Sequence, residues 1–387
     1  MPAVAWPTVT SWPTVTSWPS GTAWPSGAVT SQVATRSSVL PNTIGNTQSW
    51  MVRYASFARD NMSMFKVAWA NWYGNEQTPG GANVTTITAS IEYPAGTFTQ
   101  MKFGGNATGT APAGTTLLSD NITVAIPNGA QFWVRHFITN SFSLQYLPGY
   151  PNNALGDATT QGGTDQTMGG TVLNTANILI PTLAIIGMTS KRAVAVIGDS
   201  RQAGTGDDYQ AANGSWGEMP TGLNQYAWID LGLPSDQSAQ YLSTAGPLRA
   251  QLIGYCSDVV NAYGTNDLFV AAKTAAQLKT SQTAIAALYP TKKLWLTTID
   301  PETSSTDSWA TLGNQTVFGN EAARVTYNTD VRGGNVPGYL GYFDAAAVSE
   351  SALNSGKWKV DGTANKYTVD GIHQSAFCYR LYSFTLP

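Results

Sequence analysis

Three short motifs in the second half of the chain contain side chains suited to nucleophilic catalysis. They are Gly198–Ser200 with the sequence GDS, Gly264–Asp267 with the sequence GTND, and Asp370–His373 with the sequence DGIH. A serine nucleophile needs a base to take its proton, an acid to orient that base, and donors for the oxyanion that forms on the substrate. Together the three motifs offer a side chain for each task.

The candidate nucleophile, Ser200, follows the apolar run 193–197, which is expected to be a buried strand. Ligands of open α/β sheets bind outside the carboxyl ends of the strands, so Ser200 emerges at the edge where a site would lie. Asp199 is expected to bond nearby backbone groups and hold the turn. Arg201 is expected either to line the pocket and bind a polar or anionic substrate, or to form a surface salt bridge.

The base must be one of the two histidines in the chain, His136 or His373. His136 lies within the alternating run 131–139, and it is therefore interpreted as a strand side chain. His373 lies in a loop three residues after Asp370. On one turn, the Asp370 carboxylate can accept from one ring nitrogen of His373 while the other nitrogen faces a serine. The residues thus predict Ser200, His373 and Asp370 as a triad.

A donor for the oxyanion is available from Asn266. It follows the apolar run 258–262, which places it at another carboxyl strand end. Its side-chain amide is a suitable neutral donor. The composition of residues 264–267 is also typical of an ordinary turn, and the residues alone leave both interpretations open.

Taken together, these motifs resemble those of the SGNH hydrolases, also called the GDSL esterase/lipase superfamily, over residues 192–387. The resemblance implies a flavodoxin-like sheet, hydrolysis of acyl esters, and no metal or other cofactor. It implies that Ser200 is the nucleophile and also donates its backbone N–H to the oxyanion. His373 would be the base, Asp370 its orienting acid, and Asn266 a further donor.

The chain departs from the family pattern in the second motif block, where the family usually has a glycine whose backbone N–H is an oxyanion donor. In this sequence Ser235 stands where that glycine is expected. A serine keeps the backbone N–H, although its side chain could narrow the pocket or strain the backbone. Gly232 is the alternative donor if the register is different.

The wider pattern predicts two folded domains. Residues 47–190 contain short alternating β-runs separated by turn residues, which indicates an all-β sandwich with a binding or structural role. From residue 191 to 387, strand-like and helix-like runs alternate, which indicates an α/β domain with a parallel sheet. The β-runs are 83–93, 121–127 and 131–139; the later strand-like runs are 193–197, 258–262, 294–298 and 342–346; the helix-like runs are 270–288, 319–328 and 374–384.

The first segment, residues 1–46, begins with a repeat that places Trp6, Trp12, Trp18 and Trp24 six residues apart, each followed by proline. Six is a multiple of the strand period and of the polyproline period, so an extended segment would show all four indoles on one side. One interpretation is a low-complexity linker. The other is a docking tail that binds a particle or a second copy of the chain through these indoles.

Composition excludes several classes of protein. The net charge is 20 − 23 = −3 with 11% charged residues, which gives no basic surface for nucleic acid or an acidic membrane. No run approaches the roughly 20 apolar residues of a membrane span. Two cysteines, Cys256 and Cys378, exclude a disulfide-stapled scaffold and a Cys-rich metal site. They are expected to be free and buried, although the sequence alone does not fix whether they pair.

Two functions are compatible with these features. The first is a serine esterase that removes short acyl groups, O-acetyl groups in particular, from an acylated polysaccharide. The alternative is a structural or adhesive virion protein, such as a phage tail or capsid-decoration protein, in which hydrolysis is secondary or lost. The N-terminus shows no basic or apolar signal-peptide region. We therefore expect a virion-associated or otherwise extracellular location after release, with a cytoplasmic location as the alternative.

Overall fold

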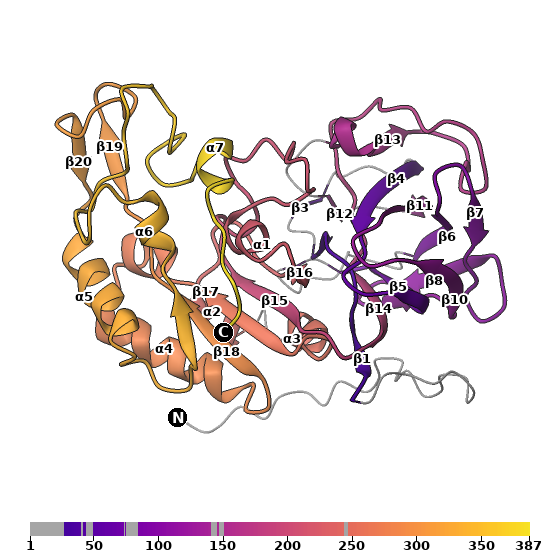
Figure 1. The fold of residues 1–387 in the computed structure, drawn as a ribbon, viewed down its shortest axis with the longest axis horizontal. Helices are drawn as coiled ribbons and strands as arrows, with labels where there is room; N and C mark the ends of the chain where they lie inside the picture. The colour runs from indigo at the N-terminus through magenta and orange to yellow at the C-terminus, as the bar shows by residue number, and fades with distance from the viewer. Residues whose placement is uncertain are drawn as a thin grey trace.

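The computed structural model describes residues 27–39, 42–43, 49–72, 74, 84–140, 145–146, 151–243 and 247–387. Over these residues, the C-terminal half forms an α/β part and the N-terminal half forms a β-rich part beside it (Figure 1). The four tryptophans of the repeat lie outside the described residues.

The α/β part contains a parallel sheet with the strand order β2-β16-β15-β17-β18-β21. Without β2 at the edge, this order is 2-1-3-4-5 along the chain, as in flavodoxin-like folds. All six residues of β15 are buried, and their side chains alternate between two apolar clusters, one on each face. Such a strand is apolar throughout because both faces are covered. The strands are β2 Ser37–Ser38, β15 Ala193–Gly198, β16 Ala227–Asp230, β17 Asp258–Ala262, β18 Lys293–Thr297 and β21 Gly341–Phe343.

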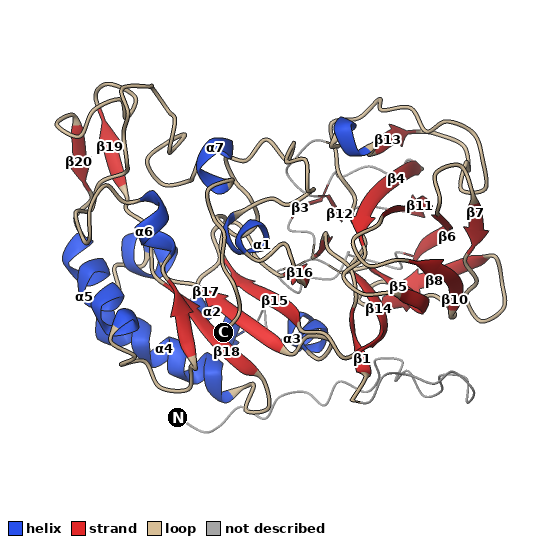
Figure 2. Ribbon diagram, viewed as in Figure 1, coloured by secondary structure: helices blue, strands red, loops and turns tan. Residues whose placement is uncertain are grey.

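Helices cover this sheet (Figure 2). The longest, α4, begins where Thr274 and Gln277 cap each other's backbone N–H groups. None of the helices in the described residues is long and apolar enough to cross a membrane. The helices are α1 Glu218–Gly222, α2 Ser238–Ser243, α3 Pro247–Ile253, α4 Ala275–Ala287, α5 Glu321–Arg332, α6 Ala345–Ser349 and α7 Ala376–Tyr379. Asn266–Val270 is a π-helical turn, and β19 Thr303–Ser305 pairs with β20 Gln315–Val317.

The β-rich part contains two antiparallel sheets that share an apolar cluster. Phe65 on one sheet and Phe132 on the other lie with ring centroids 6.3 Å apart. The first sheet contains β1 Val29–Gln32, β5 Met62–Ala70, β9 Thr116–Leu118, β10 Ile122–Ile126 and β14 Ala184–Thr189. The second contains β4 Trp50–Phe57, β6 Val84–Glu92, β7 Phe98–Gln100, β8 Thr108–Pro112, β11 Gln131–Asn140 and β13 Ala158–Gln161. A separate pair joins β3 Asn42–Thr43 to β12 Gln145–Tyr146.

The segment 27–39 corrects the predicted end of the tail at residue 46. Strand β1 pairs with β14 in an antiparallel sheet, and β2 pairs with β16 in the parallel sheet. Between them, Arg36 is 1% exposed and forms an ion pair of 2.6 Å with Asp157. Residues 27–39 are therefore part of the folded core, and any tail ends before Gly27.

This finding predicts that a chain beginning at residue 39 is much less stable than one beginning at residue 27. The shorter chain loses β1 and β2 and leaves the Asp157 carboxylate buried without its guanidinium. Breaking a buried ion pair in this way costs about 3–5 kcal/mol. Thermal unfolding of the two chains measures the difference, and Arg36→Met supplies a folded test if the shorter chain does not fold. Equal unfolding temperatures would place β1 and β2 outside the cooperative core.

Candidate active site

The nucleophile turn follows the central strand of the sheet directly. After β15 ends at Gly198, the backbone N–H groups of Gln202 and Ala203 both donate to the Asp199 carbonyl oxygen over 3.2 Å. The Asp199 carboxylate accepts from the Arg201 N–H over 3.1 Å and so holds the turn, as expected from the sequence. Ser200 is 7% exposed on this turn. The fold therefore places its hydroxyl at the carboxyl end of β15.

The DGIH loop brings the base to that hydroxyl. Nε2 of His373 lies 2.8 Å from Oγ of Ser200, and Nδ1 lies 2.7 Å from Oδ2 of Asp370. The other oxygen of Asp370 accepts from the backbone N–H groups of Ile372 and His373, over 2.8 and 2.7 Å. One carboxylate thus fixes both the loop and the imidazole ring.

The glycine within this loop has a direct steric role. Gly371 has φ +82°, and a Cβ atom there would lie 1.8 Å from the carbonyl oxygen of Thr303. Its own carbonyl accepts from the Trp358 indole N–H and the Thr303 N–H, both over 3.0 Å. No other residue would allow the loop to lie this close to β19.

The ionisation of Asp370 determines which ring nitrogen of His373 donates to it. Burial raises the pKa of Asp370, but the hydrogen bonds from the His373 ring and backbone outweigh it and hold that pKa at about 2. Because the carboxylate is ionised at neutral pH, Nδ1 of His373 must be the donor. Nε2 of a neutral imidazole is then an acceptor, which lets the Ser200 hydroxyl donate to it.

The second histidine lies elsewhere, as the sequence indicates. His136 is fully buried in β11, and its ring lies edge-on to Trp69 at 6.1 Å. Burial lowers its pKa to about 3, so the ring is neutral. It is a side chain of the β-rich core.

The candidate oxyanion donors lie on loops that contact one another. The side-chain amide of Asn266 donates to the Asp236 carbonyl over 3.0 Å, which ties it to the residue after Ser235. Ser235 has φ +66°, in the region that favours glycine. The backbone N–H groups of Ser200 and Ser235 donate to no protein acceptor within the described part of the chain.

The backbone N–H of Gly232, the alternative donor, already has an acceptor. Its N–H donates to Oδ1 of Asp230 over 2.9 Å. A Cβ atom there would lie 2.6 Å from Cβ of Gln202, so this glycine lets the loop pack against the nucleophile turn. Ser235 therefore remains the second-block candidate.

Arg201 corrects the expectation that it binds substrate. Its guanidinium is 3% exposed and donates to the carbonyl oxygens of Ile372, Asp300 and Pro301, over 3.0, 3.4 and 3.2 Å. It also lies 3.5 Å from the Asp300 carboxylate. The side chain is buried beneath the site, where it joins the nucleophile turn to the DGIH loop.

A buried acidic cluster below Arg201 was not predicted. Burial raises the pKa of Glu302 to about 8 despite the nearby Arg201, and it raises the pKa of Glu218 well above its usual value. The Gln374 amide donates to Glu218 and Asp300, each over 3.1 Å. Gln374 directly follows His373, and this position is the one feature of the sequence that could have indicated a second anchor on the loop.

The remaining candidates carry no metal or disulfide chemistry. Cys256 and Cys378 are free and buried, and burial raises the pKa of both thiols. Within the described ranges, no group of three His, Cys, Asp or Glu side chains is placed to hold a metal ion.

The buried position of Arg201 predicts a structural effect of its replacement. Arg201→Met leaves Asp300 and the acidic cluster without their cation, so we expect a loss of about 3–5 kcal/mol in the free energy of unfolding. Lys279→Met is the matched control, because Lys279 and Asp330 form a partly exposed pair that is worth at most about 1 kcal/mol. Chemical denaturation measures both. Equal losses in the two variants would contradict the anchoring role of Arg201.

Comparison with solved structures identified proteins similar to about half of the chain. A GDSL-like lipase from Bacteroides thetaiotaomicron is 18% identical with a TM-score of 0.34, over 49% of this chain and 83% of that chain. A carbohydrate acetylesterase family member from Sinorhizobium meliloti is 16% identical with a TM-score of 0.34, over 50% and 93%. The aryl esterase of M. smegmatis is 16% identical with a TM-score of 0.31, over 49% and 94%.

No protein-family model and no curated protein matches the chain. Over about half of its length, the chain is thus similar to proteins described as GDSL-like lipases and esterases, the group that its three motifs resemble.

Proposed function

We propose that this chain is a serine ester hydrolase of the SGNH type. The observation that carries the proposal is the hydrogen-bonded line from Ser200 through His373 to Asp370 at the carboxyl end of the central strand. A hydroxyl, an imidazole and an ionised carboxylate in this order are the parts of a serine nucleophile with its base and orienting acid.

The proposed reaction proceeds through an acyl-enzyme. Oγ of Ser200 attacks the ester carbonyl carbon while Nε2 of His373 takes the hydroxyl proton, and Asp370 stabilises the imidazolium that forms. The imidazolium then gives the proton to the leaving alcohol as the C–O bond breaks. Water, deprotonated by the same nitrogen, hydrolyses the acyl-serine and restores the hydroxyl.

We propose that the oxyanion is held by three donors. These are the backbone N–H groups of Ser200 and Ser235 and the side-chain amide of Asn266. The two N–H groups have no acceptor within the described residues, and Asn266 has one amide hydrogen left after its bond to Asp236. Donors that need no rearrangement lower the free energy of the charged intermediate most effectively.

We further propose that the substrate is a short acyl ester, an O-acetyl group in particular, on a polysaccharide. The β-rich part, whose two sheets we interpret as a sandwich, would contribute binding surface for such a polymer. Location on a phage particle and docking through Trp6, Trp12, Trp18 and Trp24 remain predictions from the sequence.

Replacement of the triad residues should separate their roles. We expect Ser200→Ala and His373→Ala each to reduce kcat by at least about 10⁴-fold, because each removes the proton-transfer unit. Asp370→Asn should cost less, because the base remains. Hydrolysis of aryl esters of graded acyl length measures all three and also reports acyl preference. Inactivation by His136→Ala with an active His373→Ala variant would overturn the assignment.

The oxyanion donors predict a different kinetic pattern. Asn266→Ala should lower kcat by about 10²–10³-fold with little change in KM, because the donor acts on charge that develops only in the transition state. A change confined to KM would make Asn266 a substrate-binding residue.

Ser235 offers a matched pair of variants. Ser235→Gly should keep the activity and relieve the positive φ, while Ser235→Ala keeps the N–H and removes only the hydroxyl. Both should retain kcat within a few-fold. A large loss in both would show that the hydroxyl, rather than the backbone, takes part.

A further inference from the structure

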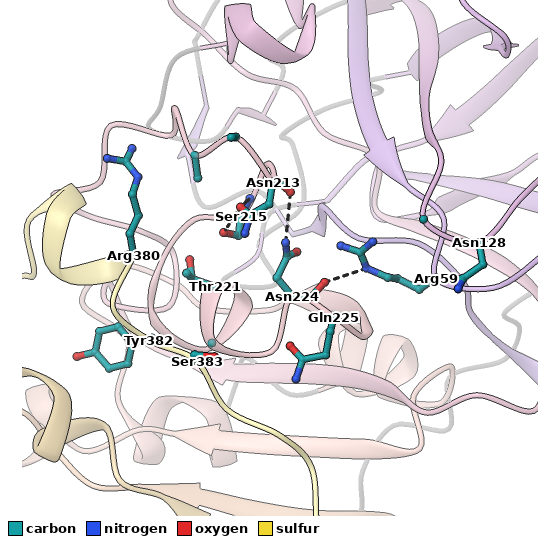
Figure 3. Close-up of a pocket in the computed structure, with 14 residues that line it drawn as sticks. Arg59, Asn128, Asn213, Ser215, Thr221, Asn224, Gln225, Arg380, Tyr382 and Ser383 are labelled. Carbon is teal, nitrogen blue, oxygen red and sulfur yellow. Dashed lines mark hydrogen bonds between the residues drawn. The ribbon is translucent and has the colours of Figure 1, made fainter.

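A pocket of about 710 Å³ lies between the two parts of the molecule, and none of the triad residues line it. Its volume falls in the range of roughly 300–1,000 Å³ that small-molecule sites occupy. Arg59 and Asn128 of the β-rich part form one side, as Figure 3 shows. Asn213 from the loop after Ser200 and Arg380 from the segment after α7 belong to the α/β part. The pocket therefore joins the two parts of the molecule.

The charged side chains that line this pocket are all positive. Its lining contains two arginines and no aspartate or glutamate, although the chain as a whole has a net charge of −3. Arg380 already forms an ion pair with Asp208. Among the described residues, Arg59 has no carboxylate at ion-pairing distance. Its Nε donates to the Asn224 carbonyl over 2.8 Å, and its Cζ lies 5.8 Å from the centroid of the Phe57 ring. Neither terminal nitrogen of its guanidinium has a hydrogen-bond partner among the described residues.

This unpaired guanidinium is also half-buried, and burial lowers the pKa of Arg59. A cation that loses part of its hydration without gaining a counter-ion destabilises the fold. An anionic ligand would supply the missing partner, and the planar guanidinium fits a carboxylate through two parallel hydrogen bonds.

The rest of the lining favours a sugar over a small inorganic anion. The pocket lining contains neutral amides and hydroxyls that can donate to or accept from the hydroxyls of a pyranose ring, whereas the Asn224 amide is already bonded to the Asn213 carbonyl and the Trp228 indole. The polar lining residues include Asn128, Asn213, Thr221, Asn224, Gln225 and Ser383.

The pocket is coupled to the candidate active site through shared segments. The loop after Ser200 supplies Asn213 to the pocket, and earlier in the same loop a Cβ on Gly206 would lie 3.4 Å from Cβ of His373. The Tyr379 hydroxyl donates to the Thr205 carbonyl over 2.8 Å and holds this loop against α7, just before Arg380. The loop after Ser200 and the segment 373–380 therefore contribute both to the pocket and to the surroundings of His373.

We propose that this pocket is a subsite for an acidic sugar, a pyranose that carries a carboxylate, with Arg59 as its anchor. The inference rests on the proposed esterase function only in that it makes the substrate an acylated acidic polysaccharide. Binding of the sugar itself requires no catalysis.

The test is a binding titration with matched sugars, followed by saturation-transfer NMR on the full chain. The probes are the methyl glycosides of glucuronic and galacturonic acid, with those of glucose and galactose as counterparts that differ only at C6. We expect the acidic sugars to bind and the neutral ones to bind at least about 10-fold more weakly, since a charge-assisted pair is lost. Equal binding of both kinds, or binding of neither, would overturn the proposal.

Variants locate the binding. Arg59→Gln should weaken the acidic sugars by about 10-fold or more, and Arg59→Lys should restore part of the loss because it keeps the charge without the planar fork. Ala212→Trp fills the pocket without altering Arg59 and should also abolish binding. Lys102→Gln, which removes an exposed positive charge outside the pocket, is the matched control and should have no effect. Loss in the control equal to that in Arg59→Gln would contradict the assignment.

Two further measurements keep this inference distinct from the esterase proposal. The wild type and the Lys102→Gln control should hydrolyse a small aryl ester at the same rate, and all four variants should unfold at temperatures near that of the wild type. If acidic sugars fail to bind while aryl esters are hydrolysed, the subsite is wrong and the esterase stands. If inorganic phosphate competes as well as glucuronoside, the pocket binds anions in general and the sugar assignment falls.

Discussion

The arrangement of the candidate site depends on holding two segments together that are about 170 residues apart in the chain. Ser200 follows the central strand, whereas His373 lies on a loop with no regular secondary structure of its own. Arg201, next to the nucleophile, donates to the Ile372 carbonyl next to the base. Because this guanidinium is buried and hydrogen-bonded, it supports the 2.8 Å contact between Ser200 and His373 from below, in addition to Asp370.

The same arginine explains why so many acids are buried here. Asp300, Glu302 and Glu218 surround Arg201 and Gln374, and each would be costly in an apolar interior without such partners. Burial holds the pKa of Glu302 near 8, so its carboxyl is mostly protonated at neutral pH and adds little negative charge. The site above it therefore has one ionised acid in contact with the imidazole, Asp370.

Sequence reasoning succeeded where the signal is local. The runs 193–197 and 258–262 are strands of the parallel sheet, as predicted. The first is apolar throughout because both of its faces are covered, and the second keeps Val259 and Val260 at its centre. The motifs GDS, GTND and DGIH fall at the positions expected for the carboxyl ends of strands or for loops. The catalytic roles of their residues stay predictions, but the structure brings Ser200, His373 and Asp370 together.

Sequence reasoning failed where tertiary contacts determine the secondary structure. Strand β2 has two residues, both serine, and no periodicity marks it; pairing with β16 alone makes it a strand. The helix predicted at 374–384 is only α7, Ala376–Tyr379, because the chain then leaves the helix and the Phe384 N–H donates to the Gly222 carbonyl over 2.7 Å. The strand predicted at 342–346 ends at Phe343, where Asp344 caps α6.

The second motif block shows how a departure from a family pattern can leave the geometry intact. What the oxyanion would need at this position is a backbone N–H that points outward, and a left-handed φ is one way to expose it. Ser235 adopts φ +66°, a conformation that glycine adopts without strain. The next residue, Asp236, is held in place because its side chain accepts hydrogen bonds from Arg249 and Tyr263 over 2.7 and 2.6 Å. The strain of a non-glycine residue there, of order 1 kcal/mol, is small beside those buried charged contacts. The surrounding network, rather than the residue type, therefore determines the backbone at this point.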